Sequence, residues 1–483
     1  MTRLATLLLA AGALLAACSS SSNCEPCPSM GNQCVPPGAC TPASCERPIV
    51  QSALPAEQVQ ALGVHKVGTT LSFTVPPDAG SVTIVQQAKV AGLNVVYKGQ
   101  VLDNSAVPLQ VFFPDGAVAY DDNVDAGSPS PDGGEDSSGN IAFYGGGTPN
   151  TGAFTMPNTT RALDGGAPAI PAGTWKFVVN DYAYECAAIV SGCSDGGSTD
   201  SQYDVTVVTR TMPPGTVMDV AFYIVGSATN TSGATLTAAN ATADPAVQRM
   251  MQTFTSILGK AGIAVNINFF DVSAADRARF GTNLNVTNTG PCEEMNQLFT
   301  LSSANPGNHM NLFLVQGLLA SNSSGAGTVV GVDGTIPGPS SFNGTVQSGA
   351  VVSMADLFAT GTRTCPLGGY DICRFGADEV AFIAAHEAGH FLGLFHTTEQ
   401  EGADFDPLSD TDKCPCLSCA LTSDRSRCGG LNAPVLRASQ CNSAPTCGGG
   451  DNLMFWFLEG GVSAGNISTQ QSQVMRLNAL VHP

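Results

Sequence analysis

The feature that most constrains this chain is the run from His386 to His396, which reads H-E-A-G-H-F-L-G-L-F-H and holds three of the chain's six histidines. His386 and His390 are four residues apart, so on an α-helix they share one face and can bind one metal ion. Gly393 lets the chain leave that helix with a positive φ angle and turn back. The turn brings His396 to the same ion.

Three neutral imidazoles suit zinc and leave a fourth coordination position open for water. An open position is typical of a catalytic site, whereas structural zinc sites are closed by four protein ligands. Glu387 lies beside the first histidine and can act as general base on the water. The residues therefore predict one catalytic Zn²⁺ ion held by His386, His390 and His396, with Glu387 as the catalytic residue.

The chain begins with the pattern of an export signal. In residues 1–17 Arg3 precedes an apolar run that is too short to span a membrane. The run ends at Leu15–Cys18 (L-A-A-C), which resembles the lipobox of bacterial lipoproteins. The resemblance implies lipidation of Cys18 and, because Ser19 follows, transport to the outer membrane or surface of a Gram-negative bacterium, with extracellular release as a variant. An ordinary signal peptide is the alternative.

The net charge of −20 argues against a nucleic acid partner, because the phosphate backbone selects for Lys and Arg. No later segment has the pattern of a membrane span, so we expect attachment through the N-terminal lipid alone. We also expect a monomer.

The N-terminal half is predicted to hold a tether and a β domain. Residues 18–48 are rich in Cys, Ser and Pro, which is typical of a tether. Residues 49–212 show short alternating strands without an amphipathic helix, which predicts an all-β sandwich. The strands are expected at Leu71–Val75, Val82–Val85, Leu109–Phe113, Trp175–Asn180 and Tyr203–Thr209. The acidic insertion Asp121–Asn140 offers carboxylates for Ca²⁺, and a solvated loop is the favoured alternative.

Residues 213–483 change to an α/β (α+β) pattern with a mixed sheet. A helix is expected over Pro245–Ala261, and a second, which carries the histidines, begins near Asp378, whose side chain can cap it. The expected strands are Asp219–Val225, Val265–Asp271, Met310–Val315, Val329–Val332 and Ala350–Met354.

The histidine run, together with Asp451–Trp456 (D-N-L-M-F-W), resembles the metzincin clan of zinc endopeptidases. The resemblance covers residues 213–483 and implies a metzincin-like catalytic domain in which Met454 forms the floor under the histidines. It implies a protein or peptide substrate that lies extended along an edge strand near Val329–Val332. Trp456 occupies a position where many clan members have a Tyr, and an indole cannot ligate zinc.

Within the clan, the pappalysin-like group is the best match. Its motifs correspond approximately to Gly349–Val352, Asp410–Asp412 and Ser468–Leu477. Two other functions stay open: a surface binding or adhesion protein with a non-catalytic zinc-protease fold, and a zinc hydrolase that acts on a non-peptide bond. The intact Glu387 favours an enzyme.

Of the 17 cysteines, Cys414, Cys416 and Cys419 have spacing that suits a structural metal site. Export to an oxidising compartment favours disulfides there instead.

The lipobox-like segment gives the first testable prediction. In a Gram-negative host the wild-type protein should partition with membranes, whereas Cys18→Ser should not mature by the lipoprotein route. Mass spectrometry of the mature N-terminus checks this, and an unmodified N-terminus at another residue would contradict it.

Overall fold

The computed structural model describes residues 25–26, 34–35, 49–51, 58–90, 95–97, 100–102, 105–107, 110–121, 141–144, 148–163, 170–188, 193–195, 197–287, 293–320, 329–361, 374–430, 432–442, 446–459 and 464–483. Cys18 and all but the first residue of the acidic insertion lie outside these ranges. Among the residues described, the structure contains no helix of the length and apolar character needed to cross a membrane.

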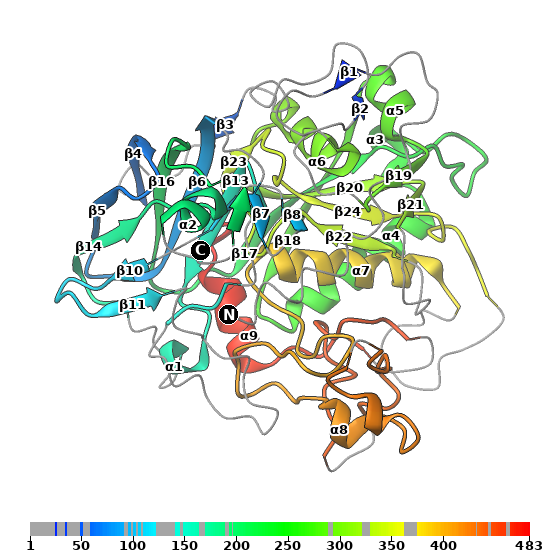
Figure 1. Ribbon diagram of the computed structural model, residues 1–483. Coiled ribbons are helices and arrows are strands. Elements are labelled where there is room, and N and C mark those ends of the chain that lie inside the picture. The colour runs from blue at the N-terminus through cyan, green and yellow to red at the C-terminus, as the bar shows by residue number, and fades with distance from the viewer. Residues whose placement is uncertain are drawn as a thin grey trace.

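Residues 49–212, which we call the β region, contain two four-stranded antiparallel sheets (Figure 1). Their strand orders are β11-β10-β14-β5 and β13-β6-β16-β4. Alternate side chains of both sheets enter one apolar cluster, among them Phe73 and Trp175 from the first sheet and Ile84 and Val207 from the second. The strands are β4 (Val59–Lys66), β5 (Thr70–Val75), β6 (Ala79–Val90), β10 (Gln110–Phe112), β11 (Val118–Asp121), β13 (Thr151–Met156), β14 (Gly173–Val178) and β16 (Gln202–Thr211). Each expected strand is present.

The β region also contains two short helices, α1 (Thr160–Leu163) and α2 (Tyr182–Ala188), which the sequence pattern did not predict. Both are too short to give a periodic apolar pattern. At the start of α2, the Asp181 carboxylate accepts a hydrogen bond from the Tyr184 backbone N–H at 2.8 Å. Minor strands form small ladders: β1 (Glu25–Pro26) with β2 (Cys34–Val35), β9 (Ser105–Ala106) with β12 (Thr148–Pro149), and β7 (Val95–Tyr97) with β8 (Gln100–Leu102) and β15 (Cys193–Asp195).

The second part of the chain is built on a mixed sheet of order β18-β17-β20-β24-β22, with β25 beside β17. The strands are β17 (Val217–Ile224), β18 (Ala264–Asp271), β20 (His309–Val315), β22 (Gly331–Asp333), β24 (Ala350–Ser353) and β25 (Val481–His482). Strands β18, β17, β20 and β24 run parallel, while β22 and β25 are antiparallel to their neighbours. The predicted mixed sheet and its strands are confirmed.

Two long helices, α4 (Pro245–Gly259) and α7 (Gly376–Phe391), pack against each other beside this sheet (Figure 1). Helix α4 begins where the Asp244 carboxylate accepts hydrogen bonds from two backbone N–H groups and Pro245 sets the first φ angle. The remaining elements are α3 (Ala238–Ala241), α5 (Ala274–Phe280), β19 (Asn283–Asn285), α6 (Glu294–Phe299), the 3₁₀ turn Thr300–Ala304, β21 (Gly317–Leu319), β23 (Phe342–Asn343) beside β3 (Val50–Gln51), α8 (Cys416–Cys419), the 3₁₀ turn Arg425–Arg427, and α9 (Thr469–Leu477).

The segment between α7 and α9 is cross-linked by disulfides Cys414–Cys441, Cys416–Cys428 and Cys419–Cys447. This confirms the disulfide interpretation of these cysteines over a second metal site, since a disulfide sulfur is no longer a thiolate ligand.

The expectation that Asp378 caps the histidine helix was wrong. Helix α7 begins at Gly376, so Asp378 lies inside the first turn. Its buried carboxylate instead accepts hydrogen bonds from Arg249 on α4, at 2.9 and 2.6 Å, and from Thr253 Oγ1 at 2.7 Å. This bidentate ion pair fixes α7 against α4.

Asp378→Ala should therefore lower the free energy of unfolding by about 2 kcal/mol. This loss is smaller than that expected on breaking a fully buried ion pair, because the Arg249 side chain is 38% exposed. Asp200→Ala is the control: this carboxylate is 82% exposed and pairs with Lys66 on the surface, so its loss should cost about 0.5 kcal/mol or less. Urea denaturation measures both, and equal effects would refute the role of Asp378.

Candidate metal centre

Helix α7 places His386 and His390 on one face, one turn apart. Gly389 lies between them, and a Cβ atom on this residue would come within 2.5 Å of the sulfur of Met454. The buried Met454 side chain therefore packs directly against the helix backbone at the histidines. The sequence expectation placed Met454 at a floor position under the histidines, and the structure places its sulfur against Gly389, between His386 and His390.

The turn after α7 has the geometry expected from Gly393, whose φ is 109°. The Gly393 N–H donates to the His390 carbonyl at 2.8 Å, and the Leu394 N–H donates to the Gly389 carbonyl at 2.9 Å. These are the two bonds of a Schellman motif, which ends the helix and reverses the chain. The reversal carries His396 back over the helix.

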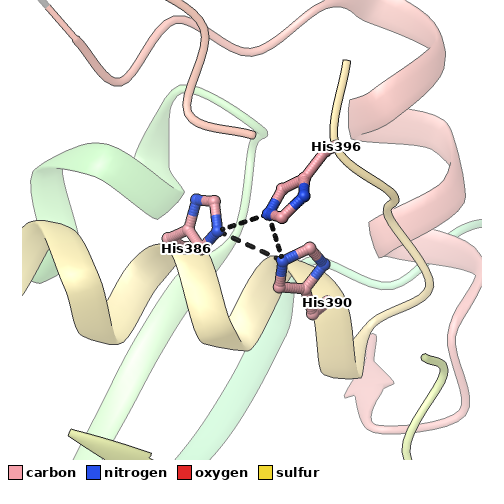
Figure 2. A group of neighbouring side chains, drawn as sticks. All are labelled: His386, His390 and His396. Carbon is pink, nitrogen blue, oxygen red and sulfur yellow. Dashed lines mark hydrogen bonds between the residues drawn. The ribbon is translucent and has the colours of Figure 1, made fainter. Parts of the chain in front are cut away.

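The Nε2 atoms of His386, His390 and His396 converge, as Figure 2 shows. The separation is 3.1 Å from His390 to each of the other two and 3.3 Å between His386 and His396. A tetrahedral zinc ion with Zn–N bonds of about 2.0–2.1 Å sets its ligand atoms roughly 3.3–3.4 Å apart. The observed triangle is close to that size.

The other ring nitrogen of each histidine is held by an acceptor. His386 Nδ1 donates to the Leu453 carbonyl at 2.7 Å, His390 Nδ1 to the Leu394 carbonyl at 2.8 Å, and His396 Nδ1 to Glu399 Oε1 at 3.0 Å. These contacts place the proton on Nδ1 and leave an Nε2 lone pair pointing inward.

Burial also favours the neutral rings. It lowers the pKa of His386 to about 3, aided by the neighbouring His396, and lowers the pKa of His390 well below its usual range. The neutral form, with one ring nitrogen free of a proton, is the form in which an imidazole can bind a metal ion. Three inward-facing nitrogens at such short range form a group that could hold a metal ion.

Glu387 is buried beside the triad, and burial raises its pKa to about 8, while a hydrogen bond from the Asp333 backbone acts in the opposite direction. Strand β22 passes directly over this carboxylate: a Cβ atom on Gly331 would lie 2.4 Å from Glu387 Oε1. A carboxyl group with a pKa near neutrality can both accept and return a proton.

Two groups around the histidines escaped sequence reasoning. Glu399 was not predicted, although an acidic residue three positions after His396 was a readable signal. Burial alone raises the pKa of Glu399, but His396 and its hydrogen bond outweigh this and lower it. The Leu453 acceptor is a backbone carbonyl, so no residue type in the sequence could have indicated it.

The loop of Met454 is fixed on both sides. The Met454 N–H donates to Asn452 Oδ1 at 2.8 Å, and the Asn452 amide pairs reciprocally with Gln471 on α9 at 2.9 and 3.1 Å. The Met454 carbonyl accepts from the Thr397 N–H at 2.9 Å, next to the third histidine. The methionine loop, α9 and the third histidine therefore form one connected unit.

Trp456 does not point a donor at the triad. Its indole N–H donates to the Leu436 carbonyl at 3.0 Å, and its ring stacks on Phe457.

No known family model matches this chain, and no curated protein matches its sequence. Among solved structures, archaemetzincin from Methanopyrus kandleri is similar at 18% identity over 41% of this chain and 86% of that chain, with a TM-score of 0.24. A family two carbohydrate esterase from Clostridium thermocellum is similar at 8% identity over 58% of this chain and 68% of that chain, with a TM-score of 0.10. Scores this low carry no argument, so the functional conclusion depends on the site itself.

The role of Glu399 can be tested by Glu399→Gln. This substitution keeps a hydrogen-bond acceptor for His396 but removes the negative charge of the carboxylate. Zinc affinity should fall about tenfold, the lower end for loss of a group that orients a ligand. Glu401→Gln, a neighbouring carboxylate that accepts from Gln400 rather than from a histidine, is the control. Competition with a chelator of known affinity measures both, and equal zinc affinities would exclude this role.

Proposed function

We propose that this protein is a zinc-dependent endopeptidase. The observation that carries the proposal is the triangle of inward-facing Nε2 atoms with the Glu387 carboxyl group buried beside it. His386, His390 and His396 would hold the ion, and three protein ligands leave room for water and substrate. When bound, zinc supplies an activated water and polarises the substrate carbonyl.

Glu387 performs the proton transfers in this proposal. It accepts a proton from the attacking water and then donates it to the leaving amine, so the peptide bond breaks without a covalent enzyme intermediate. The Asp333 backbone hydrogen bond fixes the carboxylate, and the absence of a side chain at Gly331 leaves it room. With a cation bound to the histidines, the Glu387 pKa would be lower, which would favour the ionised form that accepts the proton.

The sheet edge favours a peptide as the substrate. Strand β22 pairs with β24 on one side and has no strand partner on the other among the residues described. An extended peptide can add to such an edge through main-chain hydrogen bonds, and Glu387 lies directly beneath this strand. A small non-peptide substrate would make no use of this edge.

Membership of the pappalysin-like metzincins is the finer form of the proposal. Met454 packed under the histidines supports the clan. Two of the predicted group motifs also meet in space: Asp410 accepts from the Ser468 hydroxyl at 2.7 Å and from the Gln470 N–H at 2.8 Å.

We further propose that the protein is exported as a monomeric lipoprotein anchored through Cys18, with the β region as a sandwich domain. The three disulfides between Cys414 and Cys447 are compatible with export. An adhesion protein with a non-catalytic zinc-protease fold is the competing function, and it would bind targets without cleaving them.

Glu387→Ala should retain zinc yet lose at least about 10²–10⁴-fold in kcat/KM, because both the proton acceptor and the proton donor are removed. His386→Ala should lose zinc as well as activity. Zinc content and cleavage of a denatured protein mixture are measured on the same preparations. Substantial turnover by zinc-loaded Glu387→Ala would overturn the role of Glu387, and a zinc-loaded wild type that cleaves nothing would overturn the endopeptidase proposal.

A further inference from the structure

We propose that the β region helps to hold the metal centre in its geometry. In this proposal Phe143 and Thr160 are positioning residues for His396 and for the loop of Met454. The inference rests on the proposed zinc site but not on its reaction. It follows from three sets of contacts between segments that lie more than two hundred residues apart in the sequence.

The first contact reaches the residue beside the third histidine. The rings of Phe143 and Phe395 meet edge to face, with centroids 4.7 Å apart and an interplanar angle of 88°. Phe143 is itself fixed, because its N–H donates to Asn158 Oδ1 at 2.6 Å and its carbonyl accepts from Asn158 Nδ2 at 2.9 Å. Phe395 directly precedes His396, so this contact lies next to the third histidine.

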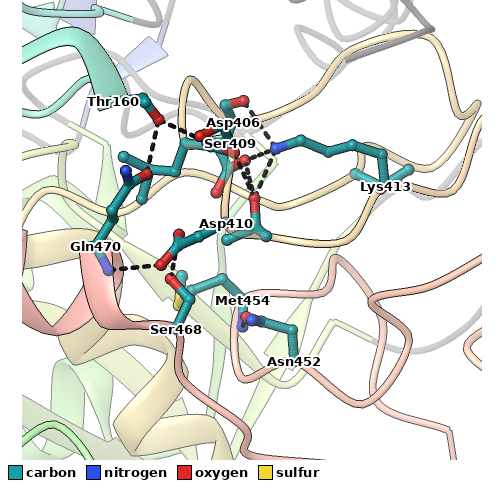
Figure 3. Close-up of polar contacts among 12 residues, drawn as sticks. Thr160, Asp406, Ser409, Asp410, Lys413, Asn452, Met454, Ser468 and Gln470 are labelled. Carbon is teal, nitrogen blue, oxygen red and sulfur yellow. Dashed lines mark hydrogen bonds and ion pairs between the residues drawn. The ribbon is translucent and has the colours of Figure 1, made fainter. Parts of the chain in front are cut away.

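The second contact is a polar junction at Thr160 on α1, drawn in Figure 3. Its hydroxyl accepts from the Ser409 N–H at 2.6 Å and donates to Gln470 on α9 at 2.7 Å, and its own N–H donates to the Pro407 carbonyl at 3.2 Å. One hydroxyl thus joins the β region to both the 406–413 loop and α9.

Two routes lead from this junction to the metal centre. The 406–413 loop is closed by the ion pair of Lys413 with Asp406, and the next residue, Cys414, donates its N–H to Thr398 Oγ1 at 3.0 Å, two residues after His396. Along α9, the residue after Gln470 holds the Asn452 amide, which in turn fixes the Met454 N–H.

The third contact is apolar. Leu163, at the end of α1, is buried in the same cluster as Leu392, Leu394 and Met454 rather than in the core of the β region. Buried hydrogen bonds extend the interface: Ser81 Oγ donates to the Leu477 carbonyl at 2.5 Å, and Arg210 Nε donates to the Val481 carbonyl at 3.0 Å. Helix α1 is therefore packed into the half of the molecule that carries the histidines.

Phe143→Ala in the full chain tests the aromatic contact. Zinc release to a chelator should become about three- to thirtyfold faster, the visible spectrum of the Co²⁺-substituted protein should change, and kcat should fall with little change in KM. Phe113→Ala is the matched control, because this ring makes a similar contact with Trp175, at 4.9 Å and 67°, inside the β region. Its zinc release and spectrum should equal those of wild type.

The Thr160 pair tests the polar junction and remains informative if Phe143→Ala does not fold. Thr160→Val keeps the shape but loses the hydroxyl and should accelerate zinc release, whereas Thr160→Ser should restore wild-type release. Identical zinc release and Co²⁺ spectra for Phe143→Ala and Phe113→Ala, or for Thr160→Val and Thr160→Ser, would overturn the inference. These readouts need no substrate. A protein that binds zinc but cleaves nothing would therefore overturn the proposed function, while the roles of Phe143 and Thr160 would still be confirmed or refuted by zinc release.

Discussion

The candidate metal centre depends on one electrostatic constraint: the Nε2 atoms of three histidines are held within 3.1–3.3 Å of one another. Nitrogen lone pairs at this distance repel unless a cation lies between them. The fold must therefore hold each ring against that repulsion, and it does so from the outer nitrogen, where every Nδ1 proton is directed to a fixed acceptor.

The three acceptors come from three different parts of the chain. Leu394 belongs to the turn after α7, Leu453 to the methionine loop, and Glu399 to the segment that follows the third histidine. Because the methionine loop is fixed by α9, and α9 contacts Thr160 of the β region, the orientation of the rings depends on packing across most of the molecule. The same burial that disfavours the charged forms of His386 and His390 raises the pKa of Glu387 to about 8.

Sequence reasoning succeeded where the information is local. The spacing of His386 and His390, the positive φ at Gly393 and the apolar periodicity of α4 and α7 each depend on residues within one or two turns of each other. It failed for Asp378, because its true partner, Arg249, lies 129 residues away and competes with capping. Glu399 was missed although it lies only three residues after His396. Phe143 and Thr160 were missed because the residues that they contact, Phe395 and Ser409, lie far away in the sequence.

X-ray absorption at the zinc edge, on the protein loaded with one equivalent of zinc, would show which atoms bind the ion. If His386, His390 and His396 hold the ion, we expect a four-coordinate shell of nitrogen and oxygen at about 2.0–2.1 Å with imidazole outer-shell scattering, consistent with three histidines and one water. A sulfur neighbour at about 2.3 Å, or a shell without imidazole scattering, would show that zinc binds elsewhere and would contradict a three-histidine zinc site.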